Sequence, residues 1–265
     1  MTVHYISDLH LDFYKDPNKH LDKFLEKFTK NIKPEDVLII AGDTSHYNLQ
    51  SVQAFKYFSN FCEVLFVTGN HEFYNVSKNM KSKYTKTYDR FNELKELTKP
   101  LENIHMLDGT IKIINDVKFG GAMGWYDGSY TRKLNDSPYA EDIMSLWYRT
   151  MNDSRLVPEL SNFYNIFNIE IIKIKDILSQ EPDIMVSHFC PISESLSFEG
   201  SFKNDPVSGF YAFDCPAQGL KMPPKWIYGH MHTPLEFEFY GSKYYRNPMG
   251  YPRQNPNITL KSFEV

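Results

Sequence analysis

The chain has 265 residues, of which 42% are hydrophobic, so it is long enough to bury a sizeable core in one large or two small domains. Its formal net charge is -4, with a sequence pI of about 6.1, which argues against a broad nucleic-acid-binding face. The longest purely apolar stretch, Val37 to Ala41, is far too short to cross a bilayer. Composition therefore favours a globular protein without membrane spans.

The cysteines and the first residues of the chain indicate in which cellular compartment the protein is expected. Cys62, Cys190 and Cys215 are odd in number and have no metal-like spacing, so we interpret them as reduced thiols. The start, Met1 to Asp8, has neither a basic segment nor a long apolar run, so no signal peptide is expected. We therefore expect a cytoplasmic protein.

The opening part of the chain alternates predicted strands and helices. Strands are predicted at Thr2 to Ser7, Val37 to Ala41 and Val64 to Val67, and helices at Leu21 to Ile32 and Leu49 to Phe58. The second strand is a continuous apolar run, as expected of a strand buried on both faces. This order predicts a parallel sheet with crossover helices.

The middle of the chain is less regular. A hairpin is predicted at Thr110 to Gly120, and Phe163 to Leu178 has the pattern of a helix. Between them, Trp125 to Leu160 is rich in Tyr, Asp, Asn and Arg, and we interpret it as a long excursion over the surface. Its aromatic residues could stack on a base, although packing against the core is the favoured interpretation.

The last part of the chain returns to predicted strands. Short strands are predicted at Ile184 to Val186 and Trp226 to Tyr228, separated by a loop from Phe198 to Pro224. A second hairpin is predicted at Leu235 to Arg246, and Ile258 to Val265 could close a sheet. No repeat, low-complexity tract or linker interrupts the chain, so residues 1–265 are predicted to form a single domain.

Five short polar motifs each follow an apolar, strand-like run. They are Asp8-Leu9-His10, Gly42-Asp43, Gly69-Asn70-His71-Glu72, Ser187-His188 and Gly229-His230-Met231-His232. In open parallel sheets, ligands bind outside the carboxyl ends of the strands, so these motifs can converge on one site. Aspartate and histidine side chains are shared by manganese, iron and zinc sites. The pattern therefore predicts a metal site built from separate loops.

The order of these motifs resembles that of the calcineurin-like metallophosphoesterases, D-x-H, G-D, G-N-H-[DE], H and G-H-x-H. The resemblance extends from residue 2 to residue 250, and all five blocks are present. It implies an α/β fold in which two packed mixed β-sheets are flanked by helices, in a four-layer αββα sandwich. It also implies metal-dependent hydrolysis of a phosphate ester.

The resemblance assigns roles to individual residues. One metal ion would be held by Asp8, His10, Asp43 and His232, and the other by Asp43, Asn70, His188 and His230. A hydroxide bridging the two ions would be the nucleophile, and His71 would face the leaving group. Carboxylate-rich ligand sets favour manganese, with iron, zinc and nickel as alternatives.

A closer resemblance, to small bacterial and phage phosphoesterases of unassigned substrate, points to further residues. Met151-Asn152-Asp153 matches an M-N-D segment, and Asn247 to Tyr251 matches N-P-R-G-Y except that Met249 replaces the arginine. The candidate substrate contacts are His46, Asn152, Arg155, Arg246 and Asn247. Arg246 or Arg253 could compensate for the missing arginine.

Three functions compete on this evidence. The favoured one is hydrolysis of a small, nucleotide-like phosphoester, such as a nucleotide or a cyclic nucleotide. A DNA or RNA nuclease is the first alternative, because repair nucleases share these motifs; the acidic balance disfavours it, and the lysines of Lys78 to Lys95 fit a solvated helix face. A non-catalytic scaffold is the second alternative, disfavoured because no ligand is missing. The oligomeric state does not follow from the sequence.

Overall fold

The computed structural model describes residues 1–15, 17–134, 142–198, 200 and 202–265. Its first sheet has five strands, in which β1 to β4 are parallel and β11 is antiparallel to β1. In spatial order the strands are β11 (Lys261–Glu264), β1 (Thr2–Ile6), β2 (Val37–Ala41), β3 (Glu63–Val67) and β4 (Ile104–Met106). The predicted parallel arrangement of the opening strands is confirmed.

The second sheet has six strands, with a parallel centre and an antiparallel strand at each edge. In spatial order they are β5 (Thr110–Ile114), β6 (Val117–Gly121), β7 (Ile184–Val186), β8 (Lys225–Tyr228), β10 (Ser242–Arg246) and β9 (Leu235–Phe239). Both predicted hairpins, β5–β6 and β9–β10, are confirmed and supply the edges.

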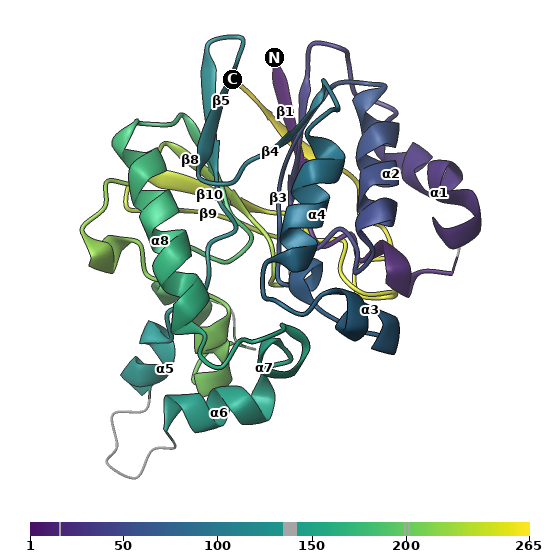
Figure 1. The fold of residues 1–265 in the computed structure, drawn as a ribbon. Coiled ribbons are helices and arrows are strands. Elements are labelled where there is room, and N and C mark those ends of the chain that lie inside the picture. Colours follow the sequence, from purple (N-terminus) through teal and green to yellow (C-terminus); the bar gives the residue numbers. More distant parts are fainter. Residues whose placement is uncertain (16, 135–141, 199, 201) are drawn as a thin grey trace.

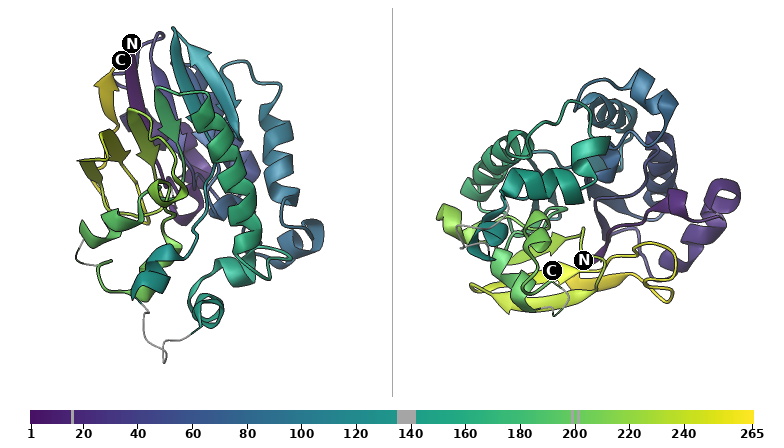
Figure 2. Two further views of the ribbon diagram at one scale, coloured as in Figure 1. Left: turned by 90° about the vertical axis from the view of Figure 1, so that its left-hand side faces the viewer. Right: turned by 90° about the horizontal axis from the view of Figure 1, so that it is seen from below.

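Helices cover the outer faces of the two packed sheets (Figures 1 and 2). The first sheet is covered by α1 (Pro17–Leu25), α2 (Asn48–Ser59) and α4 (Asp89–Thr98). The second is covered by α8 (Tyr164–Ser179), which packs on β5 and β6. The expected four-layer αββα sandwich is therefore confirmed.

The alternation of side chains along β2 explains why this strand is apolar throughout. Leu38 and Ile40 pack in the cluster beneath the helices, whereas Ile39 and Ala41 pack in the cluster between the two sheets. Because successive side chains of a strand point to opposite faces, a strand covered on both sides needs apolar residues at every position. β2 is accordingly fixed in position where it delivers Gly42 and Asp43 to the site.

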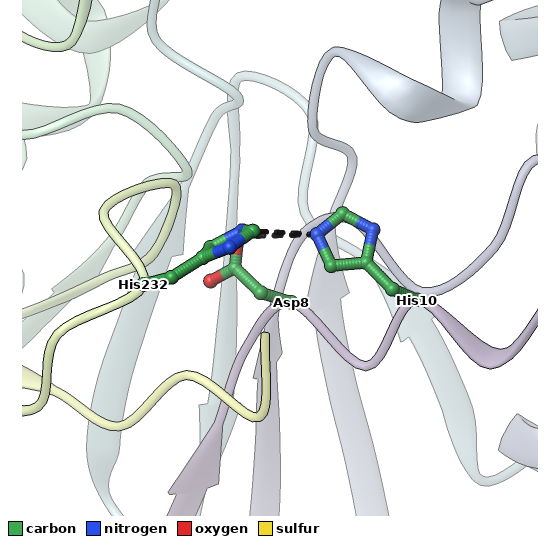
Figure 3. A group of neighbouring side chains, drawn as sticks. All are labelled: Asp8, His10 and His232. Carbon is green, nitrogen blue, oxygen red and sulfur yellow. Dashed lines mark hydrogen bonds and ion pairs between the residues drawn. The ribbon is translucent and has the colours of Figure 1, made fainter. Parts of the chain in front are cut away.

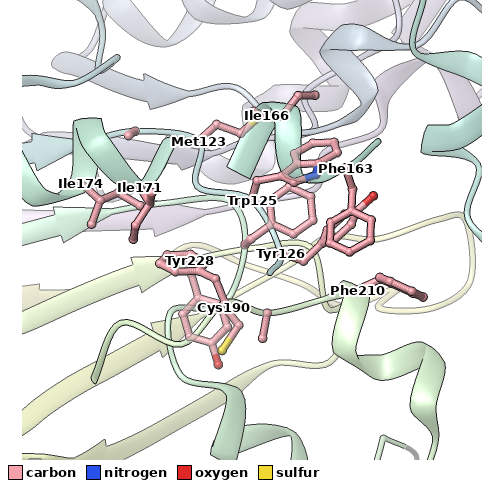
Figure 4. Packing of buried hydrophobic residues seen from close by; sticks show 14 of the residues in the cluster. Met123, Trp125, Tyr126, Phe163, Ile166, Ile171, Ile174, Cys190, Phe210 and Tyr228 are labelled. Atoms are coloured by element: carbon pink, nitrogen blue, oxygen red, sulfur yellow. The ribbon is translucent and has the colours of Figure 1, made fainter. Parts of the chain in front are cut away.

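The predicted irregular excursion at residues 125–160 contains three short helices. They are α5 (Ser129–Leu134), α6 (Ile143–Thr150) and α7 (Asp153–Leu156), with residues 135–141 outside the described part. Helices this short show too little periodicity to be recognised in a sequence. Trp125, Tyr126 and Trp147 are buried in the cluster of Figure 4, which confirms packing for these three, whereas Tyr148 is 47% exposed.

Several smaller differences from the sequence-based expectation concern short helices. The lysine-rich stretch forms α3 (Lys78–Lys83) followed by α4, and the first helix ends at Leu25. The described part of the chain also contains short 3-10 helices: η1 (Leu11–Phe13), η2 (Glu26–Phe28), η3 (His71–Phe73), η4 (Ser193–Phe198), η5 (Pro206–Phe210) and η6 (Pro216–Gln218). The last two and the end of η4 lie within the predicted loop. Among the described residues, no helix combines the length and hydrophobicity needed to cross a membrane.

Candidate metal centre

The five polar motifs lie just beyond the carboxyl ends of parallel strands from both sheets. β1, β2 and β3 lead into the motifs at residues 8–10, 42–43 and 69–72, and β7 and β8 lead into those at residues 187–188 and 229–232. The two sheets pack face to face, so these strand ends meet at one edge of the sandwich. Residues more than 200 positions apart thereby come into contact, as His10 and His232 do at 3.0 Å.

The outer set is our name for Asp8, His10, Asp43 and His232. The Nε2 atoms of His10 and His232 lie 3.0 Å apart, and Nε2 of His232 lies 3.4 Å from Oδ1 of Asp8. Figure 3 shows the Asp8, His10 and His232 side chains converging from β1 and from the loop after β8. Oδ2 of Asp43 lies 3.8 Å from Nε2 of His10. The ligand atoms of Asp8, His10 and His232 all lie within 4.8 Å of one another, and those of Asp43, His10 and His71 form a second such group, so this part of the cluster is close enough to hold a cation.

The inner set is our name for Asp43, Asn70, His188 and His230. Nε2 of His188 lies 3.3 Å from Oδ2 of Asp43, 3.2 Å from Oδ1 of Asn70 and 3.3 Å from Nδ1 of His230. Asp43 thus faces ligand atoms of both sets with the same carboxylate oxygen. The structure brings together all seven residues predicted to bind metal.

The backbone conformation at these strand ends requires glycine. A Cβ atom on Gly69 would lie 2.2 Å from Oδ1 of Asp43 and 2.7 Å from Nε2 of His188, which no side chain can tolerate. Gly42 has a φ of +85°, and a Cβ there would lie 2.4 Å from Nδ1 of His188. Any larger residue would push into the inner set.

Two buried carboxylates without a lysine or arginine partner define the electrostatics. Asp8 and Asp43 are at most 1% exposed, and in the described part of the chain their ion pairs are with histidines only. Burial alone would raise the pKa of Asp43, but His188 and His71 hold it well below its usual value. Buried anions need cationic partners, and carboxylates with imidazoles suit manganese, iron and zinc. The donor set therefore fits divalent metal ions.

Asn70 is held in one orientation by a buried polar network. Its Nδ2 donates to Oδ1 of Asp153 at 3.0 Å and to the hydroxyl of Tyr74 at 2.7 Å. Tyr74 and Tyr126 also donate to Asp153, and Trp147 donates to Tyr126. With both amide protons engaged, Oδ1 of Asn70 must face His188 and the inner set. Asp153 carried no role in our sequence analysis, although it belongs to the M-N-D segment.

Glu72 ties two of the strand-end loops together. Its carboxylate accepts hydrogen bonds from the backbone N–H groups of Asp43, Thr44 and Gly69, at 3.1, 2.7 and 2.7 Å. Burial, followed by the charge of Asp43, raises the pKa of Glu72 to about 7. This residue thus links the loops after β2 and β3 and belongs to neither ligand set.

His71 occupies the border between the two sets and the solvent. Its backbone N–H donates to Oδ1 of Asp43 at 2.9 Å, and its ring Nε2 lies 3.8 Å from Oδ2 of the same residue. Burial lowers the pKa of His71 well below its usual value, although the charge of Asp43 opposes this. The ring stacks on His46, with centroids 4.5 Å apart, and Tyr251 places its hydroxyl 3.4 Å from Nε2.

A cleft of about 350 Å³ opens onto the metal ligands. Asp43, Asn70, His71, His230 and His232 form its floor. Of the five predicted substrate contacts, only Asn152 lines this cleft. His46 lies behind His71, with Nδ1 bound to Asp12 at 2.6 Å; Arg155 donates to Asn152 and lines a separate pocket.

The other predicted contacts lie in the protein interior. Arg246 is fully buried and donates to the carbonyl of Thr233, while Asn247 donates to the carbonyls of Tyr5 and Thr259. Met249, at the position of arginine in the N-P-R-G-Y pattern, packs in the core beneath the helices. Neither Arg246 nor Arg253 is among the described residues lining the cleft, so neither replaces the missing arginine there.

Two packed mixed sheets with clustered aspartates and histidines at their strand ends define a metallophosphoesterase. The family model of calcineurin-like phosphoesterases matches residues 1–234, so the chain belongs to the calcineurin-like phosphoesterase family. An uncharacterized protein of Acanthamoeba polyphaga mimivirus is 26% identical over 270 residues, covering 97% of this chain and 93% of the relative. The family predicted from the five motifs is confirmed.

A solved structure supports the fold. The phosphopantetheinyl hydrolase of Mycobacterium tuberculosis matches with a TM-score of 0.75, over 99% of this chain and 95% of that one. The identity is 17%, so this similarity concerns the fold alone. The two-sheet architecture described above is therefore shared with an enzyme of distant sequence.

Proposed function

We propose that this chain is a dinuclear metal-dependent phosphoesterase that hydrolyses a small phosphate ester in the cleft above the two ligand sets. The observation that carries the proposal is the position of Asp43, whose Oδ2 lies 3.8 Å from His10 of the outer set and 3.3 Å from His188 of the inner set. A carboxylate shared in this way can hold two cations close together. Membership in the calcineurin-like phosphoesterase family supports this assignment.

The seven ligand residues would hold two divalent ions, with manganese favoured and iron, zinc or nickel as alternatives. When bound, such ions supply a hydroxide at neutral pH and neutralise the oxygens of a phosphate group. The protein's own contribution is rigidity. His188 is fixed by its Nδ1, which donates to the carbonyl of Ala41 at 2.9 Å, and Asn70 by Asp153 and Tyr74. A fixed tautomer and amide orientation keep the ligand atoms aimed inward.

His71 would act on the leaving group. It lines the cleft, and its lowered pKa keeps the ring neutral near pH 7. A neutral imidazole donates one hydrogen bond, so His71 would stabilise negative charge on the departing oxygen or transfer its proton there. Tyr251, whose hydroxyl is 3.4 Å from Nε2, would orient the ring.

A small substrate is favoured over a nucleic acid. The net charge is -4, whereas nucleic-acid binding depends on lysine and arginine contacts to many phosphates. The scaffold alternative is disfavoured because no residue of the five motifs is missing, and the clustering of their aspartate and histidine side chains supports a metal centre. Three free, buried cysteines support a location in the cytoplasm.

The test combines metal analysis with a substrate panel. Purified protein reconstituted with manganese is expected to hold about two ions per chain and to cleave 4-nitrophenyl phosphate or bis(4-nitrophenyl) phosphate. His71→Ala should retain the metals and lose most activity. Cleavage of labelled DNA or RNA in preference to every small ester would favour the nuclease. Inert protein with both ions bound would contradict the enzymatic proposal.

A further inference from the structure

One side of the cleft is an aromatic wall, which we define as Tyr211 and Phe202. The ring of Tyr211 lies 5.1 Å from that of the inner-set ligand His230, and Phe202 meets Tyr211 edge to face at 5.6 Å. Both side chains are partly exposed and line the cleft. Met151 and Met231 add apolar surface to the same cleft, whose remaining lining is polar but uncharged at Thr150, Asn152 and Gln254.

The wall is held in place by the segment that follows an inner-set ligand. The backbone N–H of Cys190 donates to the carbonyl of Tyr211 at 3.2 Å, and the N–H of Phe213 donates to the carbonyl of Cys190 at 2.9 Å. Cys190 lies two residues after His188. The position of Tyr211 is thus fixed relative to the metal centre, as expected of a group that positions substrate.

The cleft also lacks a fixed cationic side chain. In the described part of the chain, no lysine or arginine lines it, and its charged or titratable members besides the ligands are His71 and tyrosines. Enzymes that bind a second phosphate or a carboxylate usually present arginine or lysine to it. Beyond the metal centre, a second anionic group would find only neutral side chains such as Thr150, Asn152 and Gln254 there, and no cationic partner among the described residues that line the cleft.

We propose that the substrate carries a single phosphoryl group and an uncharged, flat substituent, and that the substituent packs on Tyr211 and Phe202. This inference rests on the proposed phosphoesterase function and specifies its substrate class. Nucleoside polyphosphates and nucleic-acid strands, which carry further phosphates, are excluded by the same two features. Tyr211 and Phe202 then determine specificity.

Binding of non-hydrolysable phosphonates tests this without relying on turnover. Manganese-loaded protein is titrated calorimetrically with methylphosphonate, benzylphosphonate and 4-(phosphonomethyl)benzoate. We expect benzylphosphonate to bind about tenfold tighter than methylphosphonate, because a stacked ring contributes on the order of tenfold in affinity. The added carboxylate should remove that advantage.

Variants assign the effect to the wall. Tyr211→Leu and Phe202→Leu should reduce the benzyl-to-methyl ratio below about threefold, while Tyr211→Phe should keep it. Phe202→Lys should restore binding of the carboxylate probe. Phe198→Leu is the matched control, because Phe198 is an exposed aromatic residue of the same region that does not line the cleft.

Two results would overturn the inference: an unchanged ratio in both leucine variants, or equal binding of benzylphosphonate and its carboxylate derivative. Failure of the proposed function looks different. In that case the wild-type protein binds no manganese and no phosphonate at all. A third result, methylphosphonate binding without any benzyl preference, would also overturn the inference but would leave the proposed phosphoesterase function intact.

Discussion

The outer and inner ligand sets share Asp43, but the surrounding protein supports them differently. In the outer set, His232 is oriented by Gln254, at 2.8 Å and near solvent, and Nδ1 of His10 has no hydrogen-bond partner among the described residues. In the inner set, His188 donates to the buried carbonyl of Ala41, and Asn70 donates to buried Asp153.

From this difference we predict which of the two ions is bound more tightly. Residues that orient metal ligands typically change metal affinity by about 10–100-fold. The groups that orient Asn70 and His188 are buried, whereas Gln254, which orients His232, lies near solvent, so the inner ion should exchange more slowly. The outer ion should be the first to leave when a chelator is added.

Removing Asp43, the residue common to both sets, should weaken both metal sites at once. Asp43→Ala is expected to lower activity on the order of 1,000-fold or more, because both ions lose a ligand. Metal analysis should show less than two equivalents of manganese. Full metal content with normal turnover of an aryl phosphate would contradict the shared position of Asp43.

A second change should leave both sets intact and affect only the reaction. His71→Ala is expected to lower kcat about 100- to 10,000-fold, as for the loss of a general acid or a charge stabiliser. Its manganese content should equal that of wild type, because we propose that His71 acts on the leaving group even though it lies within ligand distance of His10 and Asp43. A loss of manganese in this variant would instead make His71 a ligand.

The two supporting residues can be compared directly. Asp153→Asn should weaken the inner ion by about 10–100-fold, because Asn70 loses its charged acceptor. Gln254→Ala should weaken the outer ion by only a few fold, since solvent can replace an exposed hydrogen bond. Competition with a metal-sensitive dye measures both affinities.

Circular dichroism of each variant provides the control for folding. If both variants weaken the two ions equally, the asymmetry of support has no consequence for binding. If Gln254→Ala has the larger effect, the order of the two sites is reversed.

Asp36, a buried carboxylate outside the metal centre, serves as a reference for Asp43. This buried carboxylate accepts hydrogen bonds from the backbone N–H groups of Thr2 and Lys33, at 3.0 and 2.9 Å, and lies 3.1 Å from Nε2 of His4. Unlike Asp43 it is satisfied by protein donors, so it needs no cation. Asp36→Asn should therefore leave metal binding unchanged.

The expected effect of Asp36→Asn is on stability. Burial alone would raise the pKa of Asp36, but the N–H groups of Lys33 and Thr2 hold it below its usual value. A lowered carboxyl pKa stabilises the fold above the unfolded pKa of about 3.9, and this is lost as pH falls through the folded pKa. Urea unfolding should show a loss of about 1–2 kcal/mol at pH 7 and a smaller one at pH 3.

The sequence predicts which polar side chains meet at the strand ends because these side chains follow strands that are clearly apolar. The apolar run Val37 to Ala41 predicts a strand buried on both faces, and Gly42 and Asp43 follow directly at its end. The same logic applies to His188 after β7 and to His230 after β8. Strand ends of a parallel sheet meet at one edge, so adjacency along the chain becomes adjacency in space.

The residues around the ligands escape prediction for a physical reason. Asp153, Tyr211 and Phe202 lie in segments of short helices and turns, where no periodicity indicates which side chains point inward. Their partners, such as Asn70 for Asp153, are far away in the sequence and are fixed only by tertiary packing. Arg246 illustrates the converse, because a charged residue expected near substrate is fully buried in the interior.

The backbone around Asp8 has a consequence for metal uptake. Its N–H donates to the carbonyl of Gly42, and its own carbonyl accepts from the N–H of Gly250, each pair being part of a continuous ladder beyond β1. Because the backbone of Asp8 is hydrogen-bonded on both sides, the loop loses little backbone conformational entropy when a cation binds. The loop that carries Asp8 is thus ordered during folding, and we expect metal binding to be fast because the site is already formed.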